Sequence, residues 1–196
     1  ECNQILKISK DLNVKVYVNY MRNLLPSTLK IKNYITNSDI QNVNVSINHT
    51  GSLRNNGLHF LSLICCIYNF DIQKLKISMN KGKFFKATSD EISIQINFIN
   101  QIYPFFNISI SHEKGILIYE DFVNEKESSW RIYELSKNKT KNIGKKSLHK
   151  KDEFQLELDK AQDYILKSIL DDSKTNNLES ISLESALLIS NLIDKF

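Results

Sequence analysis

Alternation between apolar and polar residues dominates the middle of the chain. Val43, Val45 and Ile47 are separated by single polar residues, and a period of two is typical of a strand that buries one face. Similar patterns predict five further strands, which cover residues 72–79, 92–99, 105–111, 116–121 and 129–135. The connection at 112–115 is short enough for a hairpin, so we expect neighbouring strands to be mostly antiparallel.

The predicted strands have two chemically different faces. One face is apolar and consists of Val43, Val45, Ile47, Ile92, Ile94, Ile96, Phe98, Phe106, Ile108 and Ile110. The opposite face is polar and consists of Asn42, Asn44, Ser46, Ser93, Gln95, Asn97, Asn107, Ser109 and Ser111. An antiparallel sheet of this kind packs helices on its apolar face and leaves the other face to water. If copies of the protein pair through the polar face, we expect a homo-oligomer with a well hydrated interface.

Helical periodicity appears before, within and after this series of strands. Apolar residues recur at helical spacing in 1–11, 28–36, 60–70, 154–169 and 183–193. Ser182 is placed to cap the last of these helices, and alternation at 14–19 predicts a strand after the first helix. The order of elements therefore predicts an α+β fold: a large, mostly antiparallel open sheet with helices packed on one face.

Composition is that of an ordinary globular protein, with 41% hydrophobic and 24% charged residues. The longest apolar run, 60–70, is too short to span a membrane, and the N-terminus shows no secretion signal. The net charge of +4 comes mostly from residues 137–151, which hold seven lysines and no acid. That segment is either a solvated linker or a polyanion-binding patch. No arginine or aromatic residue is interleaved to stack on bases, which argues against a nucleic-acid partner.

Three cysteines, Cys2, Cys65 and Cys66, make an odd count. Adjacent residues on a helix point in different directions, so Cys65 and Cys66 are expected to be buried thiols rather than a disulfide. Buried thiols fit a reducing compartment, and we expect a cytoplasmic protein. No spacing of cysteine and histidine suits a metal site, so no metal is predicted.

The most distinctive stretch is the polar loop 50–63, which runs into the most apolar predicted helix. It holds two of the chain's five glycines and places His59 where the loop becomes a helix. Such a loop can present a reactive side chain at the edge of a core. Asn55, His59 and Ser62 would share one face of a helix that begins near Asn55. The histidine is therefore a candidate catalytic residue, although a satisfied core or capping histidine fits the same pattern.

Four segments of the chain resemble the Gfo/Idh/MocA superfamily, which includes glucose-fructose oxidoreductase and inositol dehydrogenase. Residues 16–22 look like that family's border strand, which ends in an arginine, and 51–63 look like its glycine-to-histidine motif. Residues 114–118 are similar to its Lys-Gly hairpin, and 182–187 are similar to the start of its C-terminal helix. The resemblance spans nearly the whole chain, and the loop is its most specific part.

The resemblance implies a division of the chain into two parts. Residues 1–22 would be the last helix and strand of an upstream Rossmann domain, and 23–196 would be the substrate and oligomerisation domain, with a basic linker at 137–151. Members of the family bind NAD or NADP in the Rossmann domain. None of the chain's glycines stands in a dinucleotide fingerprint, and the family's Glu-Lys-Pro motif, with its catalytic lysine, would fall before Glu1. We therefore expect no cofactor to bind this chain by itself.

The resemblance also implies roles for individual residues. His59 would be a general base, kept neutral by burial and by its position in the first turn of a helix. Asn55 and Ser62 stand where the family often has aspartates, so the amide at 55 would orient the substrate rather than hold charge. Arg22 would either clamp an anionic group of the substrate or pair with an acid. Tyr20 would either donate a hydrogen bond or pack between domains.

These inferences lead to one leading function and one alternative. The chain is expected to be the substrate-binding C-terminal domain of an NAD(P)-dependent oxidoreductase, inactive without its Rossmann domain, whose substrate is a hydroxyl of a sugar or sugar nucleotide. The alternative is a non-catalytic module that dimerises through the sheet or binds a ligand. A polyanion-binding role for the lysines would predict steep salt dependence.

Overall fold

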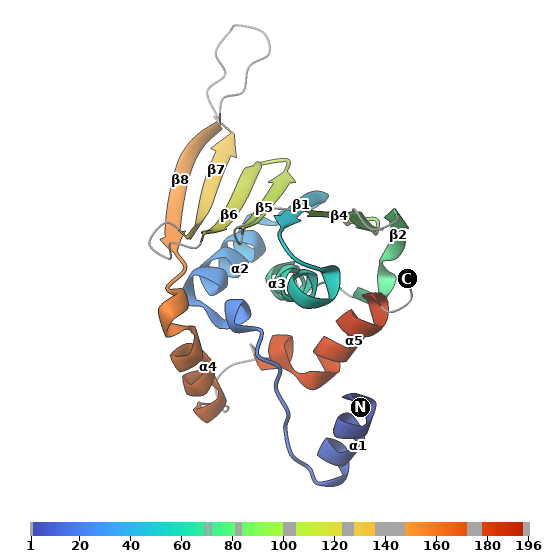
Figure 1. Cartoon of the computed structure of the whole chain (residues 1–196). Helices are drawn as coiled ribbons and strands as arrows, with labels where there is room; N and C mark the ends of the chain where they lie inside the picture. Colours follow the sequence, from blue (N-terminus) through green and yellow to red (C-terminus); the bar gives the residue numbers. More distant parts are fainter. Residues whose placement is uncertain are drawn as a thin grey trace, which may run out of the picture. The chain divides into compact units, whose positions relative to one another are not determined.

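Two compact units make up the computed structural model, which describes residues 2–68, 70, 72–80, 84–99, 105–122, 128–135, 148–171 and 178–193. The helical unit consists of 1–35, 51–75 and 157–196, and the sheet unit consists of 36–50 and 76–156 (Figure 1). Each unit is assembled from segments that are distant in the sequence. All five predicted site residues belong to the helical unit.

In the described part of the chain, the sheet unit contains one eight-stranded sheet with the order β2-β3-β4-β1-β5-β6-β7-β8. Its strands are β1 (Val43–His49), β2 (Lys76–Asn80), β3 (Phe84–Thr88), β4 (Ile92–Phe98), β5 (Phe105–His112), β6 (Gly115–Phe122), β7 (Ser129–Leu135) and β8 (Leu148–Gln155). β1 and β4 run parallel, and every other neighbouring pair is antiparallel. β2 and β8 are its two edges, so the predicted large, mostly antiparallel open sheet is confirmed.

Register across the central strands places residues of the same kind on the same face. Val45 pairs with Ile94 on β4 and with Ile110 on β5, and all three side chains are buried. On the opposite face, Asn97 Nδ2 donates a hydrogen bond to Asn48 Oδ1 at 2.9 Å. The apolar and polar faces predicted for these strands are therefore confirmed.

Strands β3 and β8 are absent from the sequence-based prediction. β8 is exposed along nearly its whole length, so no alternation marks it. Residues 148–151, predicted as part of the basic linker, pair with β7 instead, and Lys151 Nζ lies 2.7 Å from Glu134 Oε1. The linker prediction was wrong for these residues, because cross-strand ion pairs stabilise a strand that buries no apolar side chain. The rest of the predicted linker, 137–147, lies outside the described residues.

The helical unit is built around the apolar helix α3. Its helical elements are α1 (Cys2–Asp11), η1 (Met21–Leu24), α2 (Pro26–Ser38), η2 (Leu53–Gly57), α3 (Leu58–Tyr68), η3 (Ile72–Lys74), η5 (Leu158–Lys160), α4 (Ala161–Leu170), η6 (Leu178–Ile181) and α5 (Leu183–Ile193). α3 buries Phe60, Leu61 and Leu63 and contacts η1, η6 and α5. Together with the sheet, these helices confirm the α+β class. None of the described helices has the length and apolar character needed to cross a membrane.

The strand predicted at 14–19 is reduced to one bridge. Tyr17 pairs with Ser182 in an isolated antiparallel bridge, and the Val18 N–H donates to the Ile181 carbonyl at 2.7 Å. Because η6 and α5 flank Ser182 directly, the partner segment is extended at only one residue, and the prediction of a strand was wrong.

Of the two C-terminal helices, α4 begins later than predicted and α5 begins at the predicted position. The helix predicted at 154–169 begins at Ala161, because the residues before it complete β8 and η5. α5 begins where predicted, and its Ser182 cap is confirmed, since Ser182 Oγ accepts the Ser185 N–H at 3.2 Å.

Stability should fall in mild acid because of a buried histidine at the end of β1. His49 is fully buried, and its Nδ1–H donates to the Thr50 carbonyl at 2.9 Å. Burial lowers the pKa of His49 more than the hydrogen bond to Thr50 raises it. Below about pH 6.5, the ordinary pKa of histidine, the unfolded chain binds a proton that the folded chain excludes. The contribution of His49 is therefore complete above that pH and is lost as the pH falls through the folded pKa.

Urea unfolding at about pH 7.5 and about pH 5.5 measures this effect. We expect a lower free energy of unfolding at the acid pH, with His49 accounting for at most about 1.4 kcal/mol per pH unit. His49→Gln should reduce the slope, because glutamine takes up no proton. The same slope in the variant would show that His49 does not contribute.

Candidate active site

The loop before His59 is held in one turn of π-helix, η2, that continues into α3. Ser52 caps this turn, because its Oγ accepts the N–H of Asn55 at 3.2 Å. Gly51 has a φ of 93°, a conformation that would strain a residue with a side chain. The α-helix therefore begins at Leu58, three residues later than the predicted start near Asn55. This arrangement places His59 in the first turn of α3.

His59 lies against residues at the start of η1. Its ring makes an edge-to-face contact with the Tyr20 ring, with centroids 5.2 Å apart and planes at 82°. The guanidinium of Arg22 lies 5.6 Å from the centre of the neighbouring Phe60 ring. Burial of the imidazole, and after it the charge of Arg22, lower the pKa of His59. The imidazole is therefore neutral at physiological pH and can accept a proton.

Tyr20 packs within the helical unit. It is 6% exposed and forms a small core with Leu24, Leu178, Ile181 and Ala186. Burial raises the pKa of its phenol, so the hydroxyl keeps its proton at physiological pH. Packing between domains and donation to a substrate, the two roles expected from the sequence, stay predictions.

Arg22 is fixed through its backbone and adds positive charge beside His59. The Arg22 carbonyl accepts a hydrogen bond from Thr28 Oγ1 at 2.7 Å, and Thr28 is fully buried at the start of α2. A guanidinium over an aromatic face is favourable by about 0.5–1 kcal/mol at an exposed site. Its fork of donors suits a carboxylate or a phosphate. The alternatives of a substrate clamp and an ion pair both stay predictions.

The other two predicted residues lie in different surroundings. Asn55 is exposed on η2, where its backbone is tied to the Ser52 cap. Ser62 is 1% exposed, and its hydroxyl has two partners. It accepts from Asn23 Nδ2 at 2.8 Å and donates to the Ser180 carbonyl at 3.4 Å. The structure thus places Ser62 in a buried network, one turn of α3 beyond His59.

Three of the five predicted residues come together in the structure. Tyr20, Arg22 and His59 form what we call the His59 group. Asn55 lies on the π-helical turn that precedes His59. Ser62 lies one helical turn after His59 on α3, where it is buried. The catalytic role of His59 and the substrate contacts of the other four residues stay predictions.

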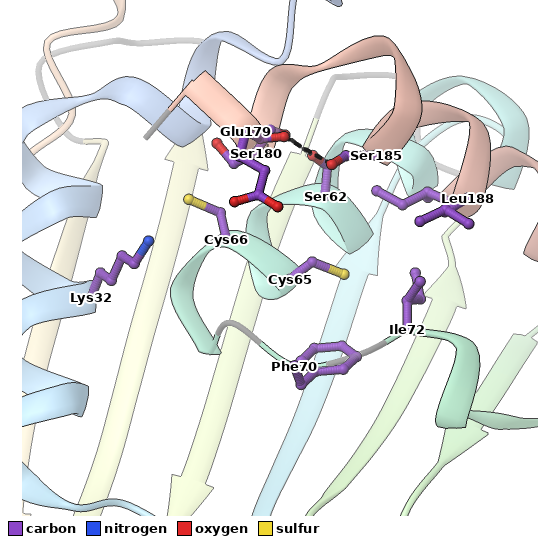
Figure 2. A pocket seen from close by; sticks show the side chains of 11 residues that line it. Lys32, Ser62, Cys65, Cys66, Phe70, Ile72, Glu179, Ser180, Ser185 and Leu188 are labelled. Atoms are coloured by element: carbon purple, nitrogen blue, oxygen red, sulfur yellow. Dashed lines mark hydrogen bonds between the residues drawn. The ribbon is translucent and has the colours of Figure 1, made fainter. Parts of the chain in front are cut away.

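A pocket of about 200 Å³ lies alongside the second half of α3. α3 contributes Ser62, Cys65 and Cys66 to its lining, and Figure 2 shows the two thiols pointing in different directions, as expected for neighbours on a helix. Both cysteines are free thiols. Burial raises the pKa of Cys65 to about 12, so this thiol stays protonated and is a poor nucleophile. Among the residues that the structure describes, no group of three or more His, Cys, Asp or Glu side chains is placed to hold a metal ion.

Asn23 is a candidate site residue that we did not predict from the sequence. It is fully buried and links η1 to α3 through Ser62. In the sequence it stands between Arg22 and two leucines, Leu24 and Leu25. A polar residue next to an apolar pair, in a segment expected to be buried, is the signal that could have indicated it.

No protein-family model and no curated protein matches the sequence. Solved structures do match. Gal80p from Saccharomyces cerevisiae, solved as a super-repressor mutant, matches with a TM-score of 0.68 and 13% identity over 99% of this chain and 66% of its own. KijD10, a 3-ketoreductase from Actinomadura kijaniata in complex with NADP, matches with a TM-score of 0.66 and 12% identity over 98% of this chain and 63% of its own. An oxidoreductase from Sinorhizobium meliloti gives 0.64 and 11% over 98% of this chain and 64% of its own.

These matches show the fold class of the chain, an α+β domain with a large open sheet. Structures of this class include oxidoreductases of the Gfo/Idh/MocA type, and this chain has the fold of their C-terminal domain, as its sequence suggested. The chain spans 63% to 66% of the length of the three structures, which is just under two thirds. Identities of 11% to 13% show the fold alone.

Proposed function

We propose that this chain is the substrate-binding C-terminal domain of an NAD(P)-dependent oxidoreductase that acts on a hydroxyl of a sugar or sugar nucleotide. The strongest support is the His59 group, in which burial and Arg22 lower the pKa of an imidazole in the first turn of α3. A neutral imidazole at physiological pH is the state that a general base requires. The π-helical turn before His59 is also a feature often found at functional sites.

His59, Arg22 and Asn55 have separate tasks in this proposal. His59 accepts the proton of the substrate hydroxyl. Burial and the charge of Arg22 disfavour the imidazolium that forms, so His59 releases the proton again readily. Arg22 binds an anionic group of the substrate, and the exposed amide of Asn55 can donate to or accept from a second hydroxyl.

NAD or NADP is the cofactor of this proposal, and another part of the full-length protein holds it. A dinucleotide fold binds the pyrophosphate through glycines in a strand-to-helix turn. The chain's five glycines do not form that pattern, so these residues do not fit the cofactor by themselves. The NADP in the KijD10 complex supports the choice of cofactor for the whole protein.

The proposed substrate class draws on Arg22 and on one of the similar structures. A mutant of KijD10 was solved with TDP-benzene and NADP, and TDP carries phosphate groups. A guanidinium beside the general base suits a phosphate of a sugar nucleotide. Neutral sugars are the less favoured substrates in this proposal, because they give Arg22 no anionic group to bind.

Helix α1 supports the presence of a larger protein around this chain. It buries no residue of its own, and Ile5 and Ile8 are 46% and 56% exposed. Leu12, on the turn that follows, is exposed as well. Apolar residues at helical spacing usually face a partner. We therefore assign helix α1 and Leu12 to the contact with the cofactor-binding part of the protein.

A second candidate is a non-catalytic module that dimerises through the sheet or binds a ligand. Gal80p was solved as a super-repressor mutant and has a similar fold. The polar face of the sheet, where Asn97 is bonded to Asn48, offers a surface for a hydrated homo-oligomer interface. Light scattering in solution measures whether a dimer forms, and a dimer that neither binds nor reduces the cofactor would fit this candidate.

Oxidation by the full-length protein tests the leading proposal. The protein is incubated with sugars and sugar nucleotides in the presence of NAD⁺ or NADP⁺, and the absorbance of the reduced cofactor is followed. We expect cofactor reduction with at least one sugar nucleotide, and none with the 196-residue chain. If the full-length protein neither reduces the cofactor nor binds it, the proposal is rejected and the non-catalytic module is favoured.

A further inference from the structure

Asn23 is a buried polar residue in η1 at the junction of three segments. Its side chain is 0% exposed. Its Nδ2 donates to Ser62 Oγ on α3 at 2.8 Å and to the Ser180 carbonyl on η6 at 3.1 Å. Ser62 Oγ also donates to the Ser180 carbonyl, at 3.4 Å. The three residues close a triangle of hydrogen bonds that joins Asn23 to partners 39 and 157 positions away in the sequence.

The orientation of the amide follows from these partners. A carbonyl oxygen only accepts, so the Asn23 group that faces Ser180 must be the NH₂ group. This orientation leaves Asn23 Oδ1 buried, and it has no hydrogen-bond partner among the residues described. A buried acceptor without a partner lowers stability. The hydrogen bonds of Asn23 to α3 and η6 therefore come with a cost in stability, which points to a role in holding η1 in place.

We propose that Asn23 is a positioning residue that holds Tyr20 and Arg22 against His59. Tyr20 and Arg22 belong to the same short segment as Asn23, and their side chains lie against the first turn of α3. Asn23 ties that segment to Ser62, one turn further along the same helix. The catalytic meaning of this role rests on the proposed function, whereas the placement of the residues does not.

Contacts along α3 show how the hydrogen bond transmits its effect. Positions 59, 62 and 66 share one face of an α-helix. Tyr20 contacts His59, Asn23 bonds to Ser62, and the Asn23 carbonyl lies 3.7 Å from Cys66 Sγ. The Asn23 N–H also donates to the Tyr20 carbonyl at 3.0 Å, so the two residues move together.

Release of η1 from α3 would reverse both causes of the lowered His59 pKa. Water would reach an imidazole that Tyr20 now covers, and the guanidinium of Arg22 would move away. In the described part of the chain, Arg22 is the charged group that acts on His59, and Tyr20 is the titratable ring in contact with it. Both changes favour the imidazolium and raise the pKa of His59.

NMR titration of the histidines in the full-length protein tests the proposal. His59 is assigned from the signal that His59→Gln removes. In Asn23→Ala we expect the His59 titration midpoint to shift upward and the nuclear Overhauser contact between the Tyr20 and His59 rings to be lost. Arg22→Gln is the positive control, since loss of the guanidinium should raise the His59 midpoint directly.

Three internal controls separate positioning from general loss of structure. His49 and His112, whose pKa values burial also lowers, belong to the sheet unit and should titrate unchanged. Ser27→Ala removes another buried hydroxyl, one without a hydrogen-bond partner among the described residues, and should leave His59 unchanged.

Two results would overturn the proposal. One is an unchanged His59 midpoint in a folded Asn23→Ala variant. If Asn23→Ala unfolds, so that all histidines shift together, Ser62→Ala decides, because it keeps the bond from Asn23 to Ser180. An unchanged His59 midpoint in Ser62→Ala is then the second overturning result, and an upward shift supports the proposal. No activity is read in this experiment, so a protein that lacks oxidoreductase activity but shows the shift would reject the proposed function alone.

Discussion

Turnover of the full-length enzyme is expected to fall about 100- to 10,000-fold when His59 is replaced by glutamine, the range typical for loss of a general base. Glutamine keeps polar atoms of similar reach, but it cannot accept the proton of the substrate hydroxyl. The loss should appear in kcat, while binding of NAD or NADP changes little, because the chain's own residues do not fit the cofactor. Steady-state kinetics and cofactor titration, each on both proteins, measure the two quantities.

His149→Gln is the matched control for this experiment. His149 is exposed on β8 in the sheet unit, so the same chemical change should leave kcat within about twofold. Equal turnover of wild type and His59→Gln would show that His59 has only a structural role. It would also leave the His59 group without a function in catalysis.

Replacement of Trp130 by alanine should lower the free energy of unfolding by about 3–5 kcal/mol, the usual cost of deleting a large aromatic side chain from a core. Trp130 on β7 is 0% exposed, and its ring meets that of Tyr119 edge to face, with centroids 4.9 Å apart. Alanine would lose this contact and leave a cavity where the indole ring is now buried. Since a domain is often stable by only about 5–15 kcal/mol, the variant should be close to unfolding.

Trp130→Phe tests the contribution of the aromatic ring separately from that of the indole N–H. Within the described strands and helices, Trp130 Nε1 is buried without a hydrogen-bond partner. Phenylalanine keeps an aromatic ring against Tyr119 and removes that N–H, so it should cost clearly less than alanine. Leu148→Ala, at an exposed position on β8, should change stability by less than about 0.5 kcal/mol. If urea unfolding shows that Trp130→Ala loses no more free energy of unfolding than Leu148→Ala, the burial of Trp130 is contradicted.

Most strands that bury one face could be predicted from sequence, although β3, which buries Phe85 and Ala87, was missed. The exposed strand β8 could not be predicted. β1 and β4 alternate because every second side chain is removed from water, as for Ile47 and Ile94. β8 carries no such mark, because backbone pairing and ion pairs such as Lys151 with Glu134 stabilise it. The strand expected around Tyr17 fails for the opposite reason. Its alternation is present, but its partner is extended at only one residue.

The candidate site shows the same division between local and long-range information. His59 could be identified because glycines, a polar loop and an apolar helix are adjacent in the sequence. The start of α3 was predicted too early, because spacing does not distinguish a π-helical turn from an α-helical one. Asn23 depends on partners in α3 and η6 that lie far away in the sequence. Only the folded chain shows that Ser62 points to this buried amide.

The pH dependence of kcat/KM for sugar-nucleotide oxidation tests the role of His59 most directly, because it reports the pKa of the essential base in the free enzyme. Burial and Arg22 lower the pKa of His59, so the acid limb should lie below about pH 6.5, the ordinary pKa of histidine. We expect this limb in the wild-type enzyme and its absence from the residual activity of His59→Gln. An acid limb that persists unchanged in the variant would contradict the role of His59 as the general base.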